Sequence, residues 1–132
     1  MEPITPSRPG HVFAEVSGWE VECCGSPFRV GDLVDADLYD YLAPAAQELF
    51  TPLEQYWSWH DDSAAPRVRA RVVNLWEVWW ELRQVGERAF ETLTGRGRAI
   101  GVHEVEIDFD RQPSGWVVEL APVVVLPHAP GS

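Results

Sequence analysis

The sequence predicts a mainly β fold, a small SH3-like or OB-like antiparallel barrel that carries a short helical insertion. Apolar and polar residues alternate with a period of two over several short segments, and clusters of glycine, proline and aspartate separate these segments. Hydrophobic residues make up 45% of the 132 residues, which suffices for one core without disulfides. The alternative is an α+β fold in which one helix covers an open sheet.

The alternation places strands on both sides of the chain's midpoint. Residues 12–16 and 67–72 alternate clearly, and Asn74 marks a kink in the second segment. After that kink, a new inward face is expected at Trp76, Val78, Trp80 and Leu82. Further strands are predicted at 33–39, at 104–109 and at 116–126, and the Gly31-Asp32 pair supplies a turn residue with positive φ before the first of these. Residues 11–127 form one domain, between a flexible lead at 1–10 and a flexible tail at 128–132.

The segment 43–60 differs from the rest of the chain. It is rich in helix formers, Pro44 suits a first helical turn, and its apolar residues are spaced for one helical face. These apolar residues are Leu49, Phe50, Leu53, Tyr56 and Trp57. We therefore expect a short helix here, interrupted at Pro52.

Charge limits the classes of partner. The net charge is −11, which repels phosphate backbones and anionic lipid, so neither nucleic acid nor a membrane is the expected partner. No secretory signal and no apolar run long enough to span a bilayer is visible, so we expect a cytoplasmic protein. No cofactor motif and no common catalytic motif is present, which favours a non-enzymatic binding module.

Aromatic residues give the first candidate site. The chain has seven tryptophans, a large number for its length, and most must be buried or line a groove. Those on apolar strand faces are assigned to the core. The others predict an aromatic groove that binds another protein, formed by Tyr56, Trp57, Trp59 and Trp79.

A stripe of arginines gives the second candidate site. Arg67, Arg69 and Arg71 share one face of a predicted strand, where they could bind a nucleotide or a single-stranded nucleic acid. The alternative is a ladder of cross-strand ion pairs with an acidic stripe of the same period, and this alternative is favoured. The acidic stripe consists of Glu104, Glu106 and Asp108.

The third candidate is the adjacent pair Cys23-Cys24. Neighbouring residues on a strand point to opposite faces, and this pair lacks the C-x₂₋₄-C spacing of zinc ligands. We therefore expect one buried cysteine, one at a turn, and neither a metal nor a disulfide between them. The alternative is a metal-binding protein or metal-dependent enzyme whose ligands include Cys23, Cys24, His60 and Asp61.

The segment "GWEVECCGSPFRVGDLV", residues 18–34, resembles an actinobacterial family of small uncharacterised proteins. The shared pattern is W-x₃-C-C-G-x₂-F-x-V-G-D followed by a hydrophobic residue. It falls on Trp19, Cys23, Cys24, Gly25, Phe28, Val30, Gly31, Asp32 and Val34. The resemblance implies a lineage and a β-rich domain of unknown function, and it implies no mechanism.

Overall fold

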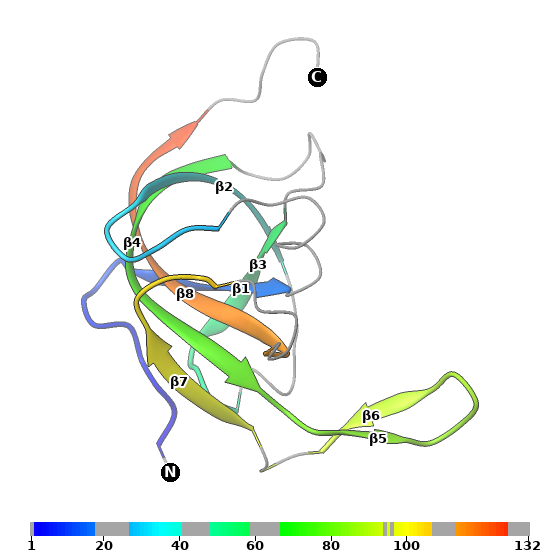
Figure 1. Cartoon of the computed structure of the whole chain (residues 1–132). Coiled ribbons are helices and arrows are strands. Elements are labelled where there is room, and N and C mark those ends of the chain that lie inside the picture. Colours follow the sequence, from blue (N-terminus) through cyan, green and yellow to red (C-terminus); the bar gives the residue numbers. More distant parts are fainter. Residues whose placement is uncertain are drawn as a thin grey trace, which may run out of the picture.

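The computed structural model describes residues 2–17, 27–40, 48–58, 67–93, 95, 97–106 and 113–126 (Figure 1). These residues form strands and no helix. The strands are β1 (Val12–Ser17), β2 (Leu33–Asp40), β3 (Leu53–Ser58), β4 (Arg67–Trp79), β5 (Leu82–Gln84), β6 (Phe90–Thr92), β7 (Arg98–Val102) and β8 (Gly115–Leu126). The predicted mainly β class is confirmed.

Six of the strands form one mixed sheet that closes on itself. Its order is β2-β3-β1-β8-β4-β7, and β2 also pairs with β4, so that β2, β3, β1, β8 and β4 form a closed ring. Strands β1 and β3 are parallel, and the other pairs in the sheet are antiparallel. Figure 1 shows the ring as strands curved around a common interior. The closed ring rules out the open sheet of the alternative prediction for this part of the chain.

Strand β4 bends, and on the side away from β8 it pairs first with β2 and then with β7. Its register with β8 shifts between Arg69 and Ala70 and again between Val72 and Asn74. Residues before the second shift pair with β2, and residues 75–79 pair with β7. The extra residue lies on β8 at the first shift and on β4 at the second, and such a residue bends the strand that carries it and increases its twist. The kink predicted at Asn74 is confirmed.

The apolar residues divide into two clusters. The inner cluster lies inside the ring and comprises Ala14, Val16, Phe28, Ala36, Leu38, Trp57, Val68, Ala70, Val72, Leu75, Val105, Trp116, Val118 and Leu120. The outer cluster lies on the outside of β1 and β8 and comprises Phe13, Phe50, Leu53, Val78 and Val117. Because both faces are covered there, β1 is buried from Phe13 to Val16 and β8 from Gly115 to Leu120, whereas the end of β8 is exposed at Val124 and Val125.

Trp76 and Trp80 are partly buried and pack against the outer cluster, whereas Leu82 is exposed. Of the four residues predicted to share an inward face after Asn74, Trp76, Val78 and Trp80 do face a core and Leu82 does not. The core that they face is the outer cluster, not the inside of the ring.

The N-terminal segment helps to cover the outer cluster. The amide of Ile4 donates to the carbonyl of Leu49 at 2.8 Å, and the carbonyl of Ile4 accepts from the amide of Thr51 at 2.9 Å. Ile4 and Leu49 both pack against the outer cluster. Residues 2–10, which the sequence places outside the domain, are thus in contact with it.

The helix expected within 43–60 is wrong for residues 53–58. This segment is β3, which hydrogen-bonds to β1 on one side and to β2 on the other. Leu53 packs in the outer cluster and Trp57 in the inner cluster, so the apolar residues are divided between two faces instead of sharing a helical one. Residues 41–47 and 59–60 lie outside the described residues.

The turn before β2 agrees with the prediction. Gly31 has a φ of 99°, and Oδ2 of Asp32 accepts a hydrogen bond from the amide of Arg29 at 3.1 Å. Glycine adopts positive φ without the steric penalty that a Cβ brings, and aspartate closes the turn through its own side chain.

Replacing Gly31 by alanine is expected to destabilise the protein by about 1–3 kcal/mol. A Cβ at Gly31 would meet no atom within 4 Å, so the whole cost comes from the backbone conformation. The matched control is Gly86→Ala, where φ is not positive and the nearest atom lies 3.4 Å away. Urea unfolding of both variants measures the difference, and equal stabilities would contradict the assignment.

Candidate functional site

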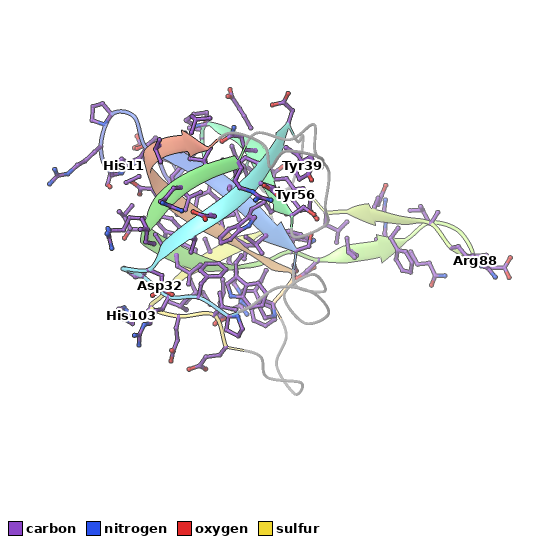
Figure 2. The ribbon with its side chains drawn as sticks, turned by 90° about the horizontal axis from the view of Figure 1, so that it is seen from above. His11, Asp32, Tyr39, Tyr56, Arg88 and His103 are labelled. Carbon is purple, nitrogen blue, oxygen red and sulfur yellow. The ribbon has the colours of Figure 1, made fainter. Side chains whose placement is uncertain are left out.

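The four predicted aromatic residues do not form one groove. Trp57 is buried inside the ring, while Tyr56, the next residue on β3, points to the outer side and packs against Tyr39 at a ring-centroid distance of 6.4 Å (Figure 2). Trp79 lies at the far end of β4, with the Arg98 guanidinium 5.6 Å from its ring. Trp59 lies outside the described residues. Successive strand residues alternate between faces, which separates Tyr56 from Trp57.

Trp57 instead forms part of a pocket at one mouth of the ring. Its ring lies 4.9 Å from that of Phe28, centroid to centroid, with 36° between the planes. The pocket above this pair has a volume of about 300 Å³. We call it the ring-mouth pocket, and it is lined by Pro27, Phe28, Asp32, Leu33, Val34, Asp35 and Trp57.

The path of β2 creates this pocket. Residues Asp37–Asp40 pair with β3, whereas residues Leu33–Asp37 pair with β4 on the other side. Strand β3 ends at Ser58, opposite Asp37, so among the described residues no strand lies beside Leu33–Ala36 on the side away from β4. The segment that precedes β2 is held by backbone hydrogen bonds from the Val105 amide to the Phe28 carbonyl, at 2.9 Å, and from the Val30 amide to the His103 carbonyl, at 2.8 Å. Figure 2 shows Asp32 and His103 together at this end of the molecule.

Two carboxylates stand at the pocket. Asp35 is bound by Arg69, whose Nε lies 2.9 Å from Oδ1, and this hydrogen bond is the main reason that the pKa of Asp35 is lowered. Asp32 is bound by the backbone of its own turn. Leu33 lies between them and is half exposed. The pocket thus combines an aromatic floor, an exposed aliphatic side chain and two acidic groups.

The arginine stripe forms a ladder, but its partner is β2. Arg67 binds Asp37 and Arg69 binds Asp35, with Nε–Oδ1 distances of 2.8 and 2.9 Å, and Arg71 donates to the carbonyl of Gly31 at 2.7 Å. The expected pairing with Glu104 and Glu106 is wrong, because the half of β4 that carries the arginines lies beside β2, and β7 contacts only the other half. Asp108 lies outside the described residues.

The predicted alternative metal ligands all lie outside the described residues. They are Cys23, Cys24, His60 and Asp61, so the expected orientation of the two cysteines stays a prediction. Among the described residues, no group of three or more histidine, cysteine, aspartate or glutamate side chains is placed to hold a metal ion. In the same part of the chain, no helix has the length and apolarity needed to cross a membrane.

Sequence reasoning missed a buried carboxylate on the outside of β8. Glu119 is 1% exposed and accepts hydrogen bonds from the Ser7 amide and hydroxyl, at 3.0 and 2.6 Å, and from Asn74 Nδ2, at 3.0 Å. Nδ1 of His11 lies 2.6 Å from the same carboxylate. Burial alone would raise the pKa of Glu119, but these hydrogen bonds together lower it below its ordinary value.

This Ser7–His11–Glu119 group is not arranged as a hydrolytic triad. In such a triad the serine hydroxyl donates to the histidine, whereas here Ser7 Oγ donates to the carboxylate. The group instead fastens the N-terminal segment to the ring.

A second buried carboxylate, Glu15, lies on the same outer side. It is 4% exposed, stands opposite Val117 on β8 and Tyr56 on β3, and its Oε2 has no hydrogen-bond partner in the part of the chain that the structure describes. Burial raises the pKa of Glu15 to about 7. The only sequence signal was a glutamate within the apolar run of residues 12–16, a pattern that also fits a solvated strand face.

Comparison with known proteins places the chain in a family of unknown function, as the resemblance implied, and leaves the actinobacterial origin and the W-x₃-C-C-G pattern as predictions. The model of a family of unknown function, DUF6578, matches residues 11–122, and the chain therefore belongs to this family. The searches of curated proteins and of solved structures gave no match.

Glu15→Gln is expected to change the pH dependence of stability. The folded state binds the Glu15 proton more tightly than the unfolded chain, whose pKa is near 4.5. This carboxyl group therefore lowers the free energy of unfolding as pH rises from about 4.5 through 7, by at most about 3 kcal/mol, and has no further effect above that range. Glutamine does not titrate, so the variant should lose this decline and be the more stable form at pH 8 and above.

Urea unfolding at a series of pH values measures the effect. Glu54→Gln is the control, because Glu54 is exposed on the adjacent strand β3. The same decline in wild type and in Glu15→Gln would contradict a neutral, buried Glu15.

Proposed function

We propose that this protein is a non-enzymatic, cytoplasmic binding module that takes an extended segment of a partner protein in the ring-mouth pocket. The segment carries a large apolar side chain next to a basic one. The observation that carries the proposal is the pocket itself, which is lined by the Phe28–Trp57 pair and by residues 32–35 at the start of β2. The SH3-like or OB-like barrel expected from the sequence is part of this proposal, and the closed ring supports it.

The side of β2 that faces away from β4 supports an extended partner. Within the described residues, Leu33–Ala36 pair with β4 on one side and with no strand on the other. A strand edge of this kind can accept a segment of another chain by main-chain hydrogen bonds, while neighbouring pockets select its side chains. The half-exposed Leu33 and the aromatic floor would receive an apolar side chain.

The acidic character of this protein supports a basic residue in the partner segment. Asp32 and Asp35 line the pocket in ion pairs with Arg29 and Arg69, and the long-range field of the net charge of −11 favours a cation of the partner that competes with these arginines. The same charge opposes the nucleic-acid alternative. Arg67 and Arg69 already bind Asp37 and Asp35, so an anion on the arginine stripe would have to compete with two intramolecular ion pairs.

A display library of random peptides tests the proposal. Peptides selected by the wild-type protein should share arginine or lysine beside an aromatic or large aliphatic residue. Leu33→Glu should weaken their binding by about tenfold or more, because it puts a charge where an apolar side chain docks. Added salt should weaken binding as well, because attraction between exposed charges is screened.

Val125→Glu is the matched control, since Val125 is an exposed valine of β8 that does not line the pocket. Amide chemical shifts that change at 33–35 on titration with a selected peptide would place the contact. Selection of no common sequence, or equal binding by wild type and Leu33→Glu, would overturn the proposal.

A further inference from the structure

A second pocket lies between the N-terminal segment and the start of β7, and we call it the β7 pocket. Its volume is about 370 Å³, larger than that of the ring-mouth pocket, and the two pockets share no lining residue among the described residues. Small-molecule sites usually have volumes of about 300–1,000 Å³. The apolar part of the lining comes from Ile4, Leu49 and Ala99, which also pack against the outer cluster. An apolar group in this pocket would therefore extend the outer cluster.

The segments that line the β7 pocket are held together by backbone contacts. The amide of Ile4 donates to the carbonyl of Leu49 at 2.8 Å, and the amide of Gly95 donates to Oε2 of Glu48 at 3.0 Å. Gly95 has a φ of 74°, a conformation that favours glycine. A Cβ at Gly97 would lie 3.2 Å from Cδ1 of Leu49, so glycine lets these two segments approach closely. The pocket is thus formed without a ligand, which lowers the ordering cost of binding.

The charged part of the lining consists of Glu2, Glu48 and Arg98. The Arg98 guanidinium lies 5.6 Å from the centre of the Trp79 ring, within the range of cation–π attraction. Neither glutamate forms an ion pair with another described residue, and Oε1 of Glu48 accepts no hydrogen bond from that part of the chain. The lining therefore carries one more negative than positive charge, and the net charge of −11 attracts a cation from a distance.

We propose that the β7 pocket binds a small organic cation, an amine with an apolar body. Its ammonium group is bound by Glu2 and Glu48, and its apolar body packs on Ile4, Leu49 and Ala99. An ammonium group has hydrogen-bond donors and no acceptor, so it matches carboxylates that can only accept. An anion of the same shape would bring its charge beside two carboxylates, and the one cation in the described lining, Arg98, already contacts Trp79.

Two probes with the same apolar body and opposite charges test this proposal. Phenethylamine should bind the ¹⁵N-labelled full chain with a Kd of about 1 mM or below, and 3-phenylpropionate at least about tenfold more weakly. Phenethylamine should shift the amide signals of Ile4, Leu49, Gly95 and Ala99, while those of residues 33–35 stay in place. The site is thereby distinguished from the ring-mouth pocket. Added salt should weaken the binding of phenethylamine, because it screens the attraction between exposed charges.

Glu2→Gln and Glu48→Gln should each weaken the binding of phenethylamine by about two- to fivefold, the usual effect of an exposed charge pair. Glutamine at position 48 can still accept the hydrogen bond from Gly95, so this substitution removes charge and keeps the wall of the pocket. The variant with both substitutions should bind phenethylamine and 3-phenylpropionate about equally. The matched control is Glu87→Gln, because Glu87 is an exposed glutamate between β5 and β6 that does not line the pocket.

Three results would overturn the proposal. The first is the absence of saturable shifts at Ile4, Leu49, Gly95 and Ala99 with phenethylamine at about 10 mM, a tenfold excess over the expected Kd. The second is equal binding of phenethylamine and 3-phenylpropionate by the wild-type protein. The third is a variant with both substitutions that binds phenethylamine as tightly as the wild type does.

Discussion

The long antiparallel pairing of β4 with β8 is the constraint on which the rest of the structure depends. Its register runs from Arg67 opposite Leu126 to Val78 opposite Gly115, and the register shift between Val72 and Asn74 bends β4 along the way. Because of the bend, β4 meets β2 with its first part and β7 with its last part. The ring closes through the β2–β4 pairing, which Leu33–Asp37 make, while Asp37–Asp40 pair with β3. The ring-mouth pocket is lined by this β4-paired part of β2, at Leu33, Val34 and Asp35.

Two carboxyl groups are buried on the outside of β1 and β8, and they differ in which protonation state their surroundings favour. Glu119 receives hydrogen bonds from Ser7 and Asn74 and contacts His11, so its charged form is favoured and it fastens the N-terminal segment. Glu15, two residues from Phe13 on the same side, has an Oε2 with no such partner in the described residues, and its neutral form is favoured. The two groups oppose each other in pH dependence: Glu119 contributes less stability as pH falls through its lowered pKa, whereas Glu15 costs more as pH rises toward 7.

Local pattern predicted the strands and their faces, but not their neighbours. Alternation in 67–72 correctly separated Val68 from the arginines, and Gly31-Asp32 correctly marked a turn. The ladder was assigned to the wrong acidic residues because a period of two identifies a face and says nothing about the adjacent strand. The segment 53–58 was misassigned because five apolar residues fit a helical spacing, whereas pairing with β1 and β2 divided them between two clusters. Glu15 and Glu119 could not be recognised, since the cover over the outer side comes from residues distant in sequence, such as Ile4 and Phe50.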